Sequence, residues 1–178
     1  EDYVDLTSDA ASMLFASNGA WRAGRASVLA HPAGTHWQYS SGTSNVLQSI
    51  LRGTFETEGA YHRYPRRVLF DPAGMASALL VADASGVFVG SSFSWMTARD
   101  WARFGLLHLW DGVWEGKRIL PEGWVEFIST PAPADNSRGY GGLFWLNRGG
   151  AWKGLPEDTF MSSGFMGQHT VIIRSRDV

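Results

Sequence analysis

The chain has 178 residues, of which 44% are hydrophobic and 18% are charged, a balance typical of a folded domain and not of a disordered segment. Fifteen lysines and arginines against 17 acidic residues give a formal net charge of −2, so no field of the whole chain attracts nucleic acid or an anionic membrane, and we expect neither partner. The chain contains no cysteine, which excludes disulfides, cysteine-ligated metals and a thiol nucleophile.

Two helices separated by a turn are expected at the start of the chain. The pattern of residues 8–17 predicts a short helix. Residues 31–35 (HPAGT) carry the proline and glycine that are typical of a turn. Apolar residues then recur on one helical face from residue 44 to Gly53, with Ser41 and Ser44 as N-cap candidates.

The middle of the chain is expected to hold one further helix between turns. Residues 61–70 are compatible with a helix that is interrupted at Pro65, because proline removes a backbone donor. Residues 71–75 (DPAGM) predict another turn. Residues 81–89 predict a hairpin around the segment DASG.

The remaining elements alternate between helices and strands. A helix is predicted over residues 97–109, a hairpin over 113–119 and a short helix over 121–128. Residues 141–146 and 170–173 are apolar enough to be strands of a covered sheet. We expect these two strands to pair in an antiparallel sheet, because the interval between them holds turn residues and no strong helical pattern.

The sum of these elements predicts a mixed α/β (α+β) fold. Residues 131–137 (PAPADNS) read as a surface loop that divides the chain. The part over about residues 1–130 is expected to be mainly helical, and the part over about 138–178 to supply the strands of the sheet. Both parts are expected to belong to one incomplete domain that spans residues 1–178.

The common local motifs of catalysis and cofactor binding do not occur in the chain. The five histidines show no metal-ligand spacing, and His108 falls on a helix where a satisfied, partly buried side chain is expected. The chain has no P-loop, no GxGxxG and no GxSxG elbow. A Ser-x-x-Lys motif is also absent, because Trp114 and Gly150 stand three residues before the two lysines, Lys117 and Lys153. We therefore expect no metal and no cofactor.

Several longer segments, taken in order, resemble one family of hydrolases. They are PAGTHWQYSSG (residues 32–42), FDPAGM (70–75), TARDWARFG (97–105), DGVW to ILP (111–121) and GFMGQ (164–168). The chain is identified by them as a member of the serine hydrolases related to class C β-lactamases, and it is most similar to the branch of esterases and 6-aminohexanoate-dimer hydrolases. The resemblance implies an antiparallel sheet flanked by helices, together with a helical region and an active site between the two.

The resemblance also implies acyl transfer through the serine of a Ser-x-x-Lys motif. Tyr39 stands where the family has a tyrosine that shares in proton transfer. A tyrosine whose pKa is near 10 is a poor base at neutral pH, so this role needs a nearby ammonium or a shared proton. Ser41 replaces the family's asparagine two positions later and is expected to bind substrate by a hydrogen bond. A structural role for Tyr39 is the alternative.

The third motif of the family, Lys/His-Thr-Gly, aligns with residues 162–164 (SSG), so its cation is missing. The resemblance places Ser163 and Gly164 beside the substrate, and the backbone N–H of Phe165 as one donor of the oxyanion hole. Glycine would let the substrate approach the strand closely. The loss of the cation favours an ester or a neutral amide as the small-molecule substrate.

Two aromatic residues, Tyr3 and Trp152, are candidates for the acyl pocket or, alternatively, for packing roles. In the family, the Ser-x-x-Lys helix precedes the tyrosine segment, and this chain starts too late to include that helix. We therefore expect a C-terminal fragment that is inactive without an N-terminal segment carrying the nucleophile. The alternative is a non-catalytic ligand-binding module of the same fold, with a cleft rich in tryptophan, since the chain has nine.

The hydropathy of the chain predicts no membrane-spanning helix. The longest apolar run, residues 78–82, is far shorter than the roughly 18 residues of a membrane-spanning helix. The chain begins at Glu1 with no apolar leader. We expect a soluble protein, with the cytoplasm and the periplasm both open.

Overall fold

The computed structural model describes residues 4, 5 and 7–178 and divides into two compact units. Unit 1 comprises the described residues through His31 together with Gln38–Arg67 and Ser77–Met96. Unit 2 comprises Pro32–Trp37, Val68–Ala76 and Thr97–Val178. In the part of the chain that the structure describes, no helix has the length and apolar character needed to cross a bilayer.

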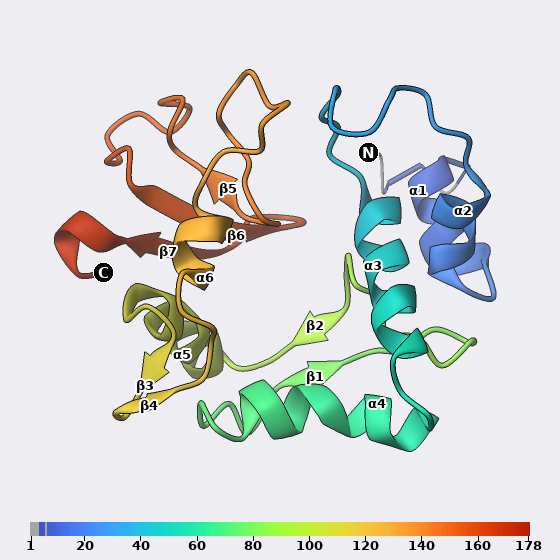
Figure 1. The fold of residues 1–178 in the computed structure, drawn as a ribbon, viewed down its shortest axis with the longest axis horizontal. Coiled ribbons are helices and arrows are strands. Elements are labelled where there is room, and N and C mark those ends of the chain that lie inside the picture. Colours follow the sequence, from blue (N-terminus) through green and yellow to red (C-terminus); the bar gives the residue numbers. More distant parts are fainter. Residues whose placement is uncertain (1–3, 6) are drawn as a thin grey trace. The chain divides into compact units, whose positions relative to one another are not determined.

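Unit 1 is built mainly from helices (Figure 1). Its elements are α1 (Asp9–Ala11), the π-helical η1 (Ser12–Ala16), α2 (Ala20–Ala26), α3 (Ser41–Gly53), α4 (Glu58–Pro65), β1 (Leu79–Leu80) and β2 (Ser94–Trp95). The π-helical η2 (Arg66–Phe70) follows α4 directly. The helix predicted over residues 8–17 is confirmed as α1 and η1, and the α-helical part of the predicted 61–70 helix ends at Pro65 as expected.

The crossing of α2 and α3 depends on two glycines. A Cβ atom on Gly24 would lie 2.8 Å from Cγ2 of Val46 and 2.9 Å from the carbonyl oxygen of Gly42. Both distances are too short for a real side chain, and the second contact is with backbone that cannot move aside. Glycine at position 24 therefore allows the two helices to approach closely.

The apolar face predicted for α3 is only partly buried, because Val46 and Leu51 are half-buried and the other two residues are exposed. Leu47 and Ile50 are 50% and 60% exposed, whereas Ser41 and Asn45 are buried. On this polar side, the Asn45 amide donates to the Ser91 hydroxyl at 3.2 Å. The helix begins one residue after Ser40, which is its N-cap, so neither predicted cap is correct, but it ends at Gly53 as predicted.

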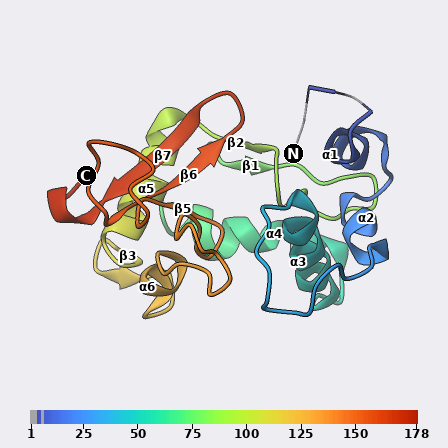
Figure 2. The same ribbon diagram turned by 90° about the horizontal axis from the view of Figure 1, so that it is seen from above.

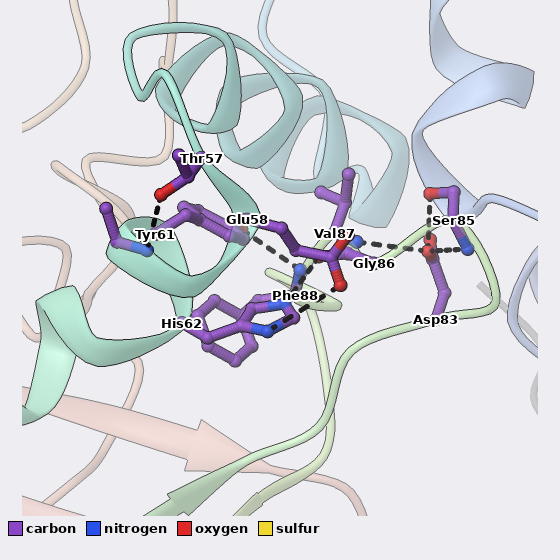
Figure 3. A network of polar contacts seen from close by, with 10 residues as sticks. Thr57, Glu58, Tyr61, His62, Asp83, Ser85, Gly86, Val87 and Phe88 are labelled. Atoms are coloured by element: carbon purple, nitrogen blue, oxygen red, sulfur yellow. Dashed lines mark hydrogen bonds and ion pairs between the residues drawn. The ribbon is translucent and has the colours of Figure 1, made fainter.

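A buried tyrosine ties the predicted 81–89 hairpin to α3 and α4, and Figure 3 shows its contact with Phe88 of the hairpin. The Tyr61 hydroxyl donates to Gln48 at 3.1 Å and accepts from the Phe88 backbone N–H at 3.0 Å. Burial raises the pKa of Tyr61, so the hydroxyl stays protonated as this pairing requires. His62 contributes a second link, with Nε2 at 2.8 Å from the Gly86 carbonyl oxygen. The turn of this hairpin is confirmed by the bond from the Gly86 N–H to the Asp83 carbonyl.

Replacing Asp83 by alanine is expected to destabilise unit 1 by about 2 kcal/mol. One Asp83 oxygen accepts from the Ala20 N–H at the start of α2, and the other accepts from the N–H and the hydroxyl of Ser85. The Val87 N–H also donates to the second oxygen, at 3.4 Å, so the substitution removes the acceptor of four donors in two segments at once. Urea unfolding measures the loss, with the exposed Glu157→Ala as control. Equal losses in the two variants would show that Asp83 does not link these segments.

Unit 2 contains the main sheet (Figure 2). Its elements are α5 (Ala98–Leu109), β3 (Val113–Trp114), β4 (Lys117–Arg118), α6 (Trp124–Ile128), β5 (Trp145–Leu146), β6 (Thr159–Gly164), β7 (Gln168–Ile173) and the 3-10 helix η3 (Arg174–Arg176). The strand order is β5-β6-β7, and both pairs are antiparallel. The mixed α/β class and an antiparallel sheet are thus confirmed, but the expected pairing of residues 141–146 with 170–173 is wrong, because β6 lies between β5 and β7 and pairs with both.

One face of this sheet forms the core of unit 2. The buried residues that pack together are Val125, Ile128, Phe144, Leu146, Phe160 and Ile172. Helix α5 lies against β7, where a Cβ on Gly105 would stand 3.0 Å from Cγ2 of Thr170. Thr170 and Ile172 therefore point toward α5, and the intervening residues of β7 point to the other face of the sheet.

Element boundaries follow the local turn chemistry closely. Helix α5 begins after Thr97, whose hydroxyl accepts from the Asp100 N–H as the predicted cap requires. The 113–119 hairpin turns at Glu115 and Gly116, which have φ angles of 48° and 77°. The helix predicted from residue 121 begins only at Trp124, because the left-handed Gly123 precedes it.

His108 is a buried and satisfied side chain, as the sequence predicted. It lies on α5 with Nδ1 at 2.8 Å from the Phe104 carbonyl oxygen, and its ring contacts Phe104 and Phe144. Burial lowers the pKa of His108 from its ordinary value of 6.5, outweighing the hydrogen bond. The folded protein therefore holds this imidazole neutral.

Stability is expected to fall as the pH drops below about 6.5. The unfolded chain binds a proton at His108 at a higher pH than the folded chain does, so acid favours unfolding between the two pKa values. Between pH 8 and pH 5.5, the free energy of unfolding of His108→Gln, measured in urea, should fall less than that of the parent protein. An identical pH dependence in the two proteins would contradict this assignment.

Candidate active site

Tyr39 lies immediately before α3. Ser40 is the N-cap with extended backbone (φ −151°), so the chain enters the helix at Ser41. The Tyr39 side chain is partly exposed, and Ser41 is buried. The predicted position of Tyr39 just upstream of a helix N-terminus is therefore correct, while Ser41 lies inside the first turn of the helix.

A groove of about 430 Å³ runs along the helices of unit 1 beside this segment. It is lined by Asp9, Ala10, Met13, Ala23, Gly24, Ser27, Ser40, Gly42, Thr43, Val46 and Leu47. The lining is mostly apolar and contains no tryptophan. Ser40, which lines the groove, is the neighbour of Tyr39 in the sequence. A ligand in the groove would therefore contact the N-terminal end of α3.

The β6–β7 hairpin carries three consecutive predicted site residues. Ser163 and Gly164 end β6, and Phe165 opens the turn with its side chain more than half exposed. The turn is held by the Gly167 N–H donating to the Gly164 carbonyl and by the Gln168 side chain donating to the Phe165 carbonyl at 3.2 Å. The hairpin thus presents Ser163, Gly164 and Phe165 at one end of the sheet.

The register of this hairpin adds a residue that sequence reasoning did not single out. Ser163 pairs with His169 across the ladder, as Gly164 pairs with Gln168. Cross-strand partners project to the same face, so a hydroxyl and an imidazole lie side by side. Gly167 in the sequence indicates a short turn here, but the pairing of Ser163 with His169 follows only from the exact register of the two strands.

Trp152 is placed by a buried asparagine. The Asn147 side chain accepts from the Trp152 N–H at 2.9 Å and donates back to the Trp152 carbonyl at 3.2 Å. Its amide also donates to the carbonyls of Leu155 and Pro156, at 2.9 and 3.2 Å. Asn147 therefore organises the loop before β6, and the Trp152 side chain remains half-buried on it.

The predicted site residues fall in both units. Tyr39 and Ser41 belong to unit 1, and Ser163, Gly164, Phe165 and Trp152 belong to unit 2. Tyr3 lies outside the described residues. Among the residues that the structure describes, no group of three or more histidine, aspartate or glutamate side chains is arranged to hold a metal ion.

The family model for beta-lactamase matches residues 1–178. The chain belongs to the beta-lactamase family. The family resemblance drawn from the sequence motifs is thus confirmed, and it explains why turn and helix motifs occur in this order along the whole chain. A comparison with curated proteins found no match.

Solved structures with a beta-lactamase-like fold agree with this assignment. A Bacillus anthracis protein described as a 6-aminohexanoate-dimer hydrolase superposes with a TM-score of 0.70 and 24% identity over 86% of this chain. A Bacteroides dorei protein described as a beta-lactamase gives a TM-score of 0.66 and 14% identity over 88% of the chain. These matches cover 39% and 53% of the respective neighbours. At such identities they show the fold, and the chain spans part of that fold.

Proposed function

We propose that this chain is part of a serine hydrolase that cleaves an ester or an amide through an acyl-enzyme. The observation that carries the proposal is the match to the beta-lactamase family over all 178 residues. The name of the Bacillus anthracis neighbour specifies a 6-aminohexanoate dimer, which is an amide, and this supports an amide or the related ester as the substrate class.

Tyr39 is proposed to share in proton transfer. A phenol of ordinary pKa gives up its proton only when a nearby positive charge stabilises the phenolate. In the proposed enzyme that charge is the lysine of a Ser-x-x-Lys motif, one helical turn from the nucleophilic serine. The partial exposure of Tyr39 and its place before the N-terminus of α3 are compatible with contact to a substrate.

The β6–β7 hairpin is proposed to hold the reacting carbonyl. The backbone N–H of Phe165 is assigned to the oxyanion hole, where a preorganised donor stabilises the charge that develops on the carbonyl oxygen. Gly164 lets the substrate lie close to the strand, and Ser163 and Ser41 supply hydrogen bonds. Tyr3 and Trp152 are proposed to contact the acyl group.

The nucleophile is proposed to come from polypeptide outside these 178 residues. No serine here is followed by lysine at the required spacing. The test is to read and express the sequence encoded before Glu1 together with this chain, and to measure hydrolysis of p-nitrophenyl acetate. The proposal is supported if the preceding sequence contains a Ser-x-x-Lys motif and the extended protein, but not the 178-residue chain, hydrolyses the ester. An extended protein that has neither the motif nor the activity would refute it.

A non-catalytic binding module is the second candidate, and the groove of about 430 Å³ in unit 1 favours it. The groove differs from the expected tryptophan-rich cleft, because small and aliphatic residues line it. A bulky substitution such as Val46→Trp would fill the groove. If the second candidate is correct, Val46→Trp abolishes ligand binding. The extended protein should then also lack acyl-transfer activity.

A further inference from the structure

Two hydrogen bonds fix the peptide groups on either side of Phe165 in the β6–β7 turn. The Gly164 carbonyl accepts from the Gly167 N–H at 3.3 Å, and the Phe165 carbonyl accepts from the Gln168 side-chain amide at 3.2 Å. The Gly164 carbonyl and the Phe165 N–H belong to one trans peptide, so they point in opposite directions. Because this carbonyl points across the turn toward Gly167, the Phe165 N–H is aimed out of the turn.

The backbone of this turn needs support from its surroundings. Met166 has a φ of 62°, in the left-handed region that is unfavourable for residues other than glycine, whereas Gly167, with a φ of 85°, adopts this region without strain. A residue like Met166 stays in such a conformation only when neighbouring contacts hold it there. The Met166 side chain is 86% exposed, so it supplies little of that support. The hydrogen bonds of the turn must therefore supply it.

Gln168 is placed to hold the turn from the first residue of β7. It pairs with Gly164 in the ladder, and a Cβ on Gly164 would lie 3.5 Å from that of Gln168. The side chain thus starts beside Gly164 and reaches over the turn to the Phe165 carbonyl. That carbonyl belongs to the peptide between Phe165 and Met166, whose orientation sets the φ of Met166. The Gln168 amide therefore holds the strained residue in place.

We propose that Gln168 is a positioning residue of the oxyanion hole. Its amide holds the turn, and the turn holds the Phe165 N–H in the direction from which a developing oxyanion would accept its hydrogen bond. The inference rests on the proposed function, which assigns this N–H to the oxyanion hole. A hydrogen bond weakens steeply when its donor is misaligned, so stabilisation of the transition state depends on a fixed donor. Gln168 should therefore affect kcat and leave KM nearly unchanged.

Amide exchange, measured by NMR on the 178-residue chain, tests whether Gln168 holds the turn. Gln168→Glu keeps the length of the side chain and replaces the donor by a carboxylate at neutral pH. Exchange of the Gly167 N–H should quicken about fivefold, the factor expected for the loss of one hydrogen bond. Thr130→Val is the control, because it removes a hydroxyl that donates to the Glu126 carbonyl elsewhere in unit 2. Unchanged exchange at Gly167 in Gln168→Glu would overturn the proposal.

Hydrolysis of p-nitrophenyl acetate and of its thiono analogue by the extended protein tests the link to the oxyanion hole. Sulfur accepts hydrogen bonds weakly, so the ratio of kcat for the oxygen ester to kcat for the thiono ester reports the donor's contribution. Gln168→Ala, which adds no charge, should lower kcat for the oxygen ester about fivefold, keep KM within about twofold and reduce the ratio. Thr130→Val should change none of these values.

The ratio separates positioning from a general loss of structure. A structural defect lowers both rates equally, so a ratio that stays constant in Gln168→Ala would overturn the proposal even if kcat falls. An extended parent protein that hydrolyses neither ester would refute the proposed function itself. The exchange measurement decides in either case whether Gln168 holds the turn, because it requires neither a substrate nor a nucleophile.

Discussion

Replacing Tyr39 by phenylalanine is expected to lower kcat of the extended, active hydrolase by about 10²- to 10⁴-fold, the range typical of losing a general acid–base group. The substitution removes one hydroxyl and keeps the ring, so the chain should still enter α3 through Ser40. The rate of p-nitrophenyl acetate hydrolysis at saturating substrate measures the effect. A pH profile that loses one limb in the variant would assign the titration to this position.

Tyr64→Phe is the matched control for this prediction. Tyr64 lies on α4, where its ring contacts Phe55, and the substitution removes a hydroxyl in the same unit. Its activity should stay within about twofold of the parent, as expected for a change away from reacting atoms. A Tyr39→Phe variant that is as active as Tyr64→Phe would exclude Tyr39 from proton transfer.

Replacing Asn147 by alanine is expected to destabilise unit 2 by about 3 kcal/mol. The buried side chain satisfies the carbonyls of Trp152, Leu155 and Pro156 and accepts from the Trp152 N–H. Alanine leaves all four backbone groups without this partner and releases the loop that carries Trp152. Urea unfolding measures the loss of free energy.

Asn136→Ala provides the control for Asn147, because it removes the same amide from an exposed turn. Its cost should be below about 0.5 kcal/mol. Amide exchange should also quicken at residues 152–156 in Asn147→Ala and not in the control. If both variants lose the same free energy, the loop is held by other contacts.

The elements set by local chemistry could be predicted from the sequence. The Thr97 hydroxyl caps α5, and the left-handed pair Glu115 and Gly116 closes the β3–β4 hairpin. Each signal acts within four residues, so it does not depend on the rest of the fold. The place of Tyr39 before α3 follows in the same way from the turn and the helical spacing around it.

Features that depend on distant partners could not be predicted. The burial of Asn45 on the polar side of α3, where it donates to Ser91 46 residues away, is not indicated by the apolar spacing of the helix. The pairing of Ser163 with His169 depends on a register that a shift of one residue would reverse. Asn147 has no sequence signature, because its acceptors lie on a loop without regular structure.

The central claim is that the acylated serine lies outside these 178 residues, and fluorophosphonate labelling followed by intact-mass measurement tests it most directly. The folded 178-residue chain should remain unlabelled, and the protein extended to include a Ser-x-x-Lys motif should gain one adduct per molecule. Near-UV circular dichroism from the nine tryptophans would establish that the shorter chain is folded during the reaction. An adduct on a serine of the folded 178-residue chain would contradict the claim.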